Sequence, residues 1–289
     1  MASMTTNFSQ YSSIRNQEPL TLEQIARYAP SAVATRAHES RSSRYTYIPT
    51  LDVIAGMRDA GFVPFKASQS RTKDESRREF TKHMIRFRHM DLQSIAVGEH
   101  VPEIVLINSH DGTSAYKLMA GIFRLVCSNG MVVAESMLAS ITVSHVGDVV
   151  RNVINGSLEL TDRVPAALQT IERWGQLQLT SGERNAFAES AHMLRFADEN
   201  GQATTPITPA QLLETRRSDD DRSDLWHTFN TVQENVIRGG LRGRTARTPE
   251  NPRGRRVTTR PVNGIDQDVK LNRALWQLAE RMAELKAAA

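Results

Sequence analysis

One stretch of the chain determines the expected fold, Glu103-Ile104-Val105-Leu106-Ile107-Asn108-Ser109-His110-Asp111-Gly112-Thr113. Its first half is almost continuously apolar, which is typical of a buried β-strand. The Asp-Gly pair that follows is a strong turn signal, and residues 114–127 return as a long strand or as a strand pair bent at Gly121. The stretch therefore predicts an antiparallel hairpin inside a sheet.

Further elements are predicted on both sides of this hairpin. We expect strands at 45–48, 62–69, 80–90, 131–133 and 141–143 and helices at 21–29 and 51–60. Thr21 and Thr50 stand where N-caps are favoured, and Gly61 stands where a helix C-terminal glycine is favoured. The predicted fold class is α+β, with a twisted, mostly antiparallel sheet, a packed helix and a helical C-terminal region.

The pattern changes to helical periodicity near residue 148. We expect helices at 148–154, 164–177, 183–196, 223–237 and 265–286, with Ser181 as a cap. The predicted organisation is a flexible arm and short helix (1–35), an α+β core domain (36–147), a helical region (148–237), a basic Arg-rich linker (238–264) and a C-terminal amphipathic helix (265–289). The leucine stripe of the last helix suits docking on its own domain or on a neighbouring subunit.

Composition excludes several classes of protein. The 289 residues include a single cysteine, so an intramolecular disulfide framework is impossible. No apolar stretch approaches the ~20 residues that span a bilayer, and the polar N-terminus lacks a secretory signal. We expect a cytoplasmic protein of a bacterial cell or phage host, without a membrane partner.

No sequence motif of a known enzyme class is present. A zinc-hydrolase His-Glu-x-x-His, a Walker phosphate loop, a dinucleotide-binding glycine motif and a Gly-x-Ser-x-Gly elbow are all missing. The cluster Asn108–Gly112 reads as a tight turn, and a metal-dependent site at His110 and Asp111 is the less favoured alternative. Cys127 reads as a buried inert thiol. We expect no catalysis, no cofactor and no metal.

The strand at 80–90 carries cations on one face. Lys82, Met84, Arg86 and Arg88 share that face, while His83, Ile85, Phe87 and His89 share the other, where the histidines are expected to be packed and hydrogen-bonded. A charged loop precedes the strand, and together they supply the candidate phosphate contacts Arg71, Lys73, Arg77, Arg78, Lys82, Arg86 and Arg88. The alternative is an ordinary solvated strand face.

A second basic feature lies at 238–260. Its candidate nucleic-acid contacts are Arg238, Arg242, Arg244, Arg253, Arg255, Arg256 and Arg260, with Arg247 among them in sequence. Interrupted by Gly and Pro, the segment reads as an unstructured arm whose guanidinium groups pair with phosphates and stack on bases. The alternative is a charged linker that tethers the last helix.

Three runs carry a resemblance to a known family. They are Asn108–Thr113, Gly121-x-Phe123-Arg124-Leu125-Val126-Cys127-Ser128-Asn129-Gly130 and Val143-x-His145. The chain resembles, from about Tyr47 to the final helix, a family of uncharacterised phage- and plasmid-associated proteins (a domain of unknown function). The resemblance implies carriage by a mobile element and brings no catalytic residues.

A remoter resemblance concerns Tyr47-Ile48, the helix at 51–60, Gly61-Phe62 and the cationic hairpin. Their order is similar to the opening of the ring-forming single-strand annealing recombination proteins. That resemblance implies a twisted antiparallel sheet with a helix, a basic groove around a homo-oligomer, and backbone contacts at Lys82, Arg86 and Arg88.

These features lead to one functional hypothesis with an alternative. The hypothesis is a non-catalytic single-stranded DNA-binding or annealing protein of a mobile element, serving phage or plasmid recombination or replication as a homo-oligomer. RNA could replace DNA as its ligand. The alternative is a protein-interaction or anti-defence module without nucleic-acid binding.

Overall fold

The computed structural model describes residues 13–15, 18–40, 47–90, 100–124, 140–143, 148–249 and 251–288. The described residues form two compact units. The sheet unit contains those up to 124 together with 140–143 and 148–164, and the helical unit contains those from 165 onward.

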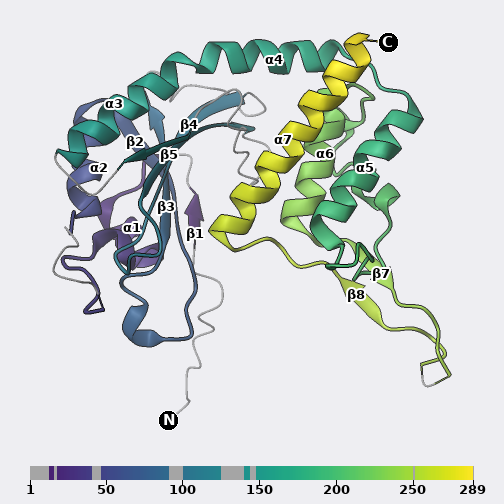
Figure 1. Ribbon diagram of the computed structural model, residues 1–289, viewed down its shortest axis with the longest axis horizontal. Helices are drawn as coiled ribbons and strands as arrows, with labels where there is room; N and C mark the ends of the chain where they lie inside the picture. The colour runs from purple at the N-terminus through teal and green to yellow at the C-terminus, as the bar shows by residue number, and fades with distance from the viewer. Residues whose placement is uncertain are drawn as a thin grey trace. The chain divides into compact units, whose positions relative to one another are not determined.

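The sheet unit is built on a six-stranded antiparallel meander in the order β1-β2-β3-β4-β5-β6 (Figure 1). Its strands are β1 (Ser13–Arg15), β2 (Phe62–Gln69), β3 (His83–His89), β4 (His100–Asn108), β5 (Tyr116–Arg124) and β6 (Ser140–Val143). The predicted hairpin is β4–β5, with Leu106 opposite Leu118. Gly112 in its turn has a φ of 77°, which confirms the tight turn expected from Asp-Gly.

Helices α2 (Thr50–Asp59) and α3 (Val149–Asp162) contact strands of this sheet, and α1 (Leu22–Tyr28) lies beside β1 and β2. Thr21 caps α1 in a capping box with Gln24, as predicted. Gly156 of α3 lies so close to the sheet that an added Cβ would be 3.0 Å from Leu118 Cδ1. Sheet and helices together confirm the α+β class.

The helical unit contains α4 (Val164–Gln176), α5 (Ser181–Phe196), α6 (Leu225–Arg238) and α7 (Ile265–Ala288). The ring centroids of Trp174 and Trp276 are 4.4 Å apart, and Phe229 packs edge-on against Trp276. The α5 cap is Thr180 in a capping box with Glu183, so the expectation of Ser181 was one residue too late. Helix α7 packs within its own unit, against α5 and α6, with Leu271 and Leu275 buried and Leu285 exposed.

The segment expected to be an unstructured linker folds as a hairpin of β7 (Arg242–Arg244) and β8 (Arg256–Thr258), which extends away from the helices of its unit (Figure 1). The prediction of an unstructured arm is therefore wrong, and Leu241 at the start of the hairpin is buried. The boundary expected near residue 148 also differs from the structure, since α3 belongs with the sheet.

Some sequence predictions concern residues outside the described part of the chain. These are Cys127, the Asn129-Gly130 turn, the strand at 131–133, His145 and the first half of the strand at 45–48. Tyr47 and Ile48, which are described, lie outside any strand.

Candidate nucleic-acid interface

The cations of β3 do not form a solvent-facing surface. The side chains of Arg86 and Arg88 are only 1% and 5% exposed, and both guanidinium groups bond the carboxylate of Glu103 on β4. The distance from Arg88 Nε to Glu103 Oε1 is 2.7 Å, and Arg88 also lies 4.1 Å from the centroid of the Phe65 ring. The prediction that Arg86 and Arg88 contact phosphates is therefore wrong, because a buried carboxylate already pairs with both.

The loop before β3 contains balanced charges. Its four cations at 71–79 are opposed by Asp74, Glu75 and Glu79, so its net charge is small. Arg77 pairs with Asp74 and Arg78 with Glu75, both at the surface. The remaining predicted contacts are the exposed Arg71 and Lys73 in the loop and the half-buried Lys82, which precedes the strand. Without Arg86 and Arg88, these residues do not form a continuous basic track.

The β7–β8 hairpin and its flanks carry a cluster of exposed positive charge. Seven exposed arginines belong to it: Arg242, Arg244, Arg247, Arg253, Arg255, Arg256 and Arg260. In the part of the chain that the structure describes, none of these seven side chains forms an ion pair. Within 242–260 the sequence offers a single carboxylate, at position 250. This hairpin is the candidate interface.

Backbone hydrogen bonds close the base of the hairpin, and side chains of the helical unit hold it. The Gly240 amide donates to the Thr259 carbonyl, and the Thr259 amide donates to the Leu241 carbonyl. Gly239 has a φ of +65°, and a Cβ there would lie 2.7 Å from the carbonyl carbon of Arg260. Side chains of Gln211 and Arg216 donate to the carbonyls of Arg242 and Gly239. Three of the seven arginines, Arg242, Arg244 and Arg256, thus stand on the strands of an ordered ribbon.

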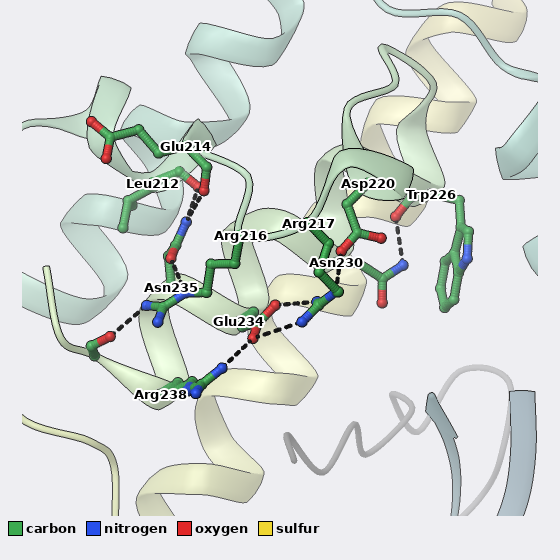
Figure 2. Close-up of polar contacts among 11 residues, drawn as sticks. Leu212, Glu214, Arg216, Arg217, Asp220, Trp226, Asn230, Glu234, Asn235 and Arg238 are labelled. Carbon is green, nitrogen blue, oxygen red and sulfur yellow. Dashed lines mark hydrogen bonds and ion pairs between the residues drawn. The ribbon is translucent and has the colours of Figure 1, made fainter. Parts of the chain in front are cut away.

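The last turn of α6 ends in a buried charge cluster next to this base (Figure 2). Glu234, 3% exposed, accepts from Arg217 and from Arg238, whose Nη1 is 3.0 Å from Glu234 Oε1. Arg216 donates to Asn235 Oδ1, and Asn235 donates in turn to the Leu212 and Glu214 carbonyls. Arg238 is therefore a helix residue paired with a carboxylate, which contradicts its assignment to an unstructured arm.

A buried polar cluster in the sheet unit surrounds Thr50. Its hydroxyl lies 3.1 Å from His83 Nε2, 3.3 Å from His110 Nε2 and 3.2 Å from the Tyr116 hydroxyl, and it accepts from Asn108 Nδ2. Thr50 is the first residue of α2 and makes no capping bond, so its predicted capping role is wrong. Burial, followed by the nearby His110, lowers the pKa of His83 to about 3.

Burial confirms His83 as a packed, hydrogen-bonded histidine. The carboxylate of Asp111 accepts from the Thr113 amide at 3.0 Å and from its hydroxyl at 2.6 Å, which is the turn role expected for it. Burial acts to raise the pKa of Asp111, but hydrogen bonds from Thr113 and Ser109 together outweigh burial and lower this pKa. His110 and Asp111 thus make different local contacts, one in the Thr50 cluster and one in the turn.

A family model described as "Domain of unknown function (DUF932)" matches residues 37–276. The chain belongs to this family. Two similar proteins of Escherichia coli (strain K12) are the UPF0380 proteins YafZ and YfjQ. Each is 43% identical over 282 residues, which cover 98% of this chain and 98% of the relative. No solved structure matches the chain.

The DUF932 match spans both units, from the residues before α2 to the middle of α7, and includes the arginine hairpin. None of the helices in the described ranges is long and apolar enough to cross a membrane. The described residues also contain no group of three or more His, Cys, Asp or Glu side chains placed to hold a metal ion.

Proposed function

We propose that this DUF932 protein is a non-catalytic nucleic-acid-binding protein whose contact surface is the β7–β8 hairpin, with single-stranded DNA of a mobile element as the ligand expected from sequence. The observation that carries the proposal is the set of seven exposed arginines without ion pairs among the described residues. Guanidinium groups pair with phosphate oxygens, and displacement of condensed counterions drives such binding. The cations of β3 contribute nothing to it.

The ordered base of the hairpin supports the same proposal. A recognition segment that is already folded loses less conformational entropy when it binds than a disordered one does. Backbone bonds between Gly240, Leu241 and Thr259 join the two sides of the hairpin at its base, and bonds from the Gln211 and Arg216 side chains hold this base. The arginines are thus presented together on one segment, as a polyanion requires.

Fluorescence anisotropy of a labelled single-stranded oligonucleotide tests the proposal. We expect binding at low salt whose logarithmic salt dependence has a slope of up to about −5 if all seven arginines contact phosphates. The hairpin variant carries Arg253→Gln, Arg255→Gln and Arg256→Gln. The matched control carries Arg151→Gln, Arg222→Gln and Arg281→Gln, which remove the same charge from exposed positions elsewhere.

The hairpin variant is expected to reduce the salt slope by about 2, whereas the control leaves it nearly unchanged. Annealing of complementary strands, followed with the same proteins, tests the annealing part of the proposal. Absence of binding at low salt, or equal losses in the two variants, would contradict it. The protein-interaction alternative would then be favoured.

A further inference from the structure

The two strands of the hairpin present different residues on their two faces. In the register of the ribbon, Arg242 is opposite Thr258, Gly243 opposite Val257 and Arg244 opposite Arg256. Exposure alternates in both strands, with the central Gly243 and Val257 half-buried and their neighbours exposed. One face is therefore turned to the protein, and the other carries the guanidinium groups.

The inner face lies against the body of the helical unit. A Cβ on Gly243 would be 2.7 Å from the Pro206 carbonyl oxygen and 3.0 Å from Ile207 Cδ1, so only glycine lets the strand approach this closely. The ribbon is thus supported from behind at its centre, where Gly243 and Val257 are half-buried. Only its outer face is available to a ligand.

On the outer face, two like charges stand directly opposite each other. A cross-strand pair of cations such as Arg244 and Arg256 is unfavourable unless an anion lies beside it. Arg244 Nη1 donates to the Arg253 carbonyl at 2.7 Å, and this neutral acceptor brings no negative charge to the pair. The arrangement suits a ligand that brings negative charge to the centre of the ribbon.

The residues of the hairpin also indicate the form of the nucleic acid. Proteins that bind single strands combine cations with aromatic side chains on which the bases stack. Residues 238–264 contain no Phe, Tyr, Trp or His. In duplex DNA the bases are already stacked, and its major groove is wide enough for a two-stranded β-ribbon. Arginine is also the side chain that most often contacts guanine O6 and N7 in that groove.

We infer that the outer face of the β7–β8 ribbon enters the major groove of duplex DNA, with Arg242, Arg244 and Arg256 at the base edges and adjacent phosphates. The inference rests on the proposed nucleic-acid binding by this hairpin, and it replaces the single-stranded ligand expected from sequence with a B-form duplex. An RNA duplex is disfavoured, because its deep, narrow major groove excludes such a ribbon.

The test titrates the full-length protein into a mixed-sequence DNA duplex about two helical turns long, into each of its separate strands and into the RNA duplex of the same sequence. We expect the DNA duplex to bind about tenfold more tightly than either strand or the RNA duplex. Methylation of guanine N7 by dimethyl sulfate, which reports on the major groove, is expected to fall in the bound DNA duplex.

The variant Arg242→Gln/Arg244→Gln/Arg256→Gln is expected to lose both the duplex preference and the N7 protection. The control Arg151→Gln/Arg222→Gln/Arg281→Gln is expected to keep both, and tryptophan fluorescence verifies that the helical unit of each variant is folded. Equal or tighter binding of single strands, or unchanged N7 methylation, overturns the inference and leaves the proposed function intact. Binding of none of these nucleic acids overturns the proposed function itself.

Discussion

Replacing Glu103 by Gln tests the charge cluster that removes Arg86 and Arg88 from any binding surface. The substitution keeps the size and shape of the side chain and removes only its negative charge. In the structure Glu103 is 2% exposed, and it contacts both guanidinium groups. We therefore expect a large loss of stability in the sheet unit.

The magnitude follows from the burial of all three groups. Breaking a buried ion pair by removing one partner costs about 3–5 kcal/mol, because the remaining charge is left in a medium of low polarity. Two arginines lose their carboxylate here, while the glutamine oxygen remains as an acceptor. A loss of about 3–5 kcal/mol corresponds to a decrease of about 2 M in the urea midpoint, for a typical denaturant dependence of about 2 kcal/mol per M.

The assay must separate the two units. All three tryptophans lie in the helical unit, so their fluorescence follows that unit alone. Amide hydrogen exchange in β3 and β4, measured by mass spectrometry as urea increases, follows the sheet unit. The matched control is Glu159→Gln on α3, which removes an exposed ion pair with Arg163 and is expected to cost less than about 0.5 kcal/mol.

A third variant distinguishes uncompensated charge from disturbed packing. The triple substitution Arg86→Met/Arg88→Met/Glu103→Leu removes all three charges together, and such replacements of buried ion pairs are often neutral or stabilising. We expect this triple variant to recover most of the stability lost in Glu103→Gln. A Glu103→Gln protein within about 1 kcal/mol of wild type would refute the reasoning, because the arginines would then be solvated.

Three further predictions concern other parts of the chain. The pKa of His83 is about 3 in the folded protein and about 6.5 in the unfolded chain, so its contribution to stability is complete above pH 6.5 and is lost as the pH falls. Between pH 6.5 and pH 5, the free energy of unfolding of the wild type should therefore fall by about 1.5 kcal/mol more than that of His83→Gln, as measured by urea titration. Gly239→Ala, at positive φ against a backbone carbonyl, should loosen the hairpin and speed its cleavage by trypsin, whereas Gly175→Ala, with open space around it, should not. Glu234→Gln should lower the urea midpoint of the helical unit by about 1 M, because two arginines lose a carboxylate that is only 3% exposed. Tryptophan fluorescence measures this midpoint, and a midpoint equal to that of the wild type would contradict the prediction.

Alternation along β3 was sufficient to predict which residues share a face. His83 lies on the side of Thr50 and α2, and Arg86 and Arg88 lie together on the other side, as the period of two requires. Alternation could not predict whether the cationic face is exposed to water. The carboxylate that pairs with these arginines, Glu103, belongs to β4, and the register between β3 and β4 cannot be predicted from the sequence of β3 alone. A signal was nevertheless present, since a lone carboxylate in an apolar strand requires a buried cation.

The arginine hairpin was misread for a related reason. The composition of the segment predicts disorder. Two apolar residues are nevertheless present, Leu241 directly before β7 and Val257 within β8. A two-stranded element needs few apolar residues when its inner face is mostly backbone. The close approach of Gly243 to Pro206 depends on a residue far away in sequence. Local composition contains no information about that contact.

Comparison of the arginine sets shows why charge counts alone locate a binding surface poorly. Arg86 and Arg88 share the carboxylate of Glu103, and Arg217 and Arg238 share that of Glu234, so these guanidinium groups already have an anionic partner within the fold. The hairpin arginines have the same side chain, but none of them pairs with a carboxylate in the described residues. A guanidinium that must first leave an internal carboxylate contributes little free energy to the binding of an external polyanion. A guanidinium that is ordered and has no internal carboxylate partner contributes most. Binding energy is therefore expected to concentrate in the helical unit, although the sheet unit contains the more conspicuous basic strand.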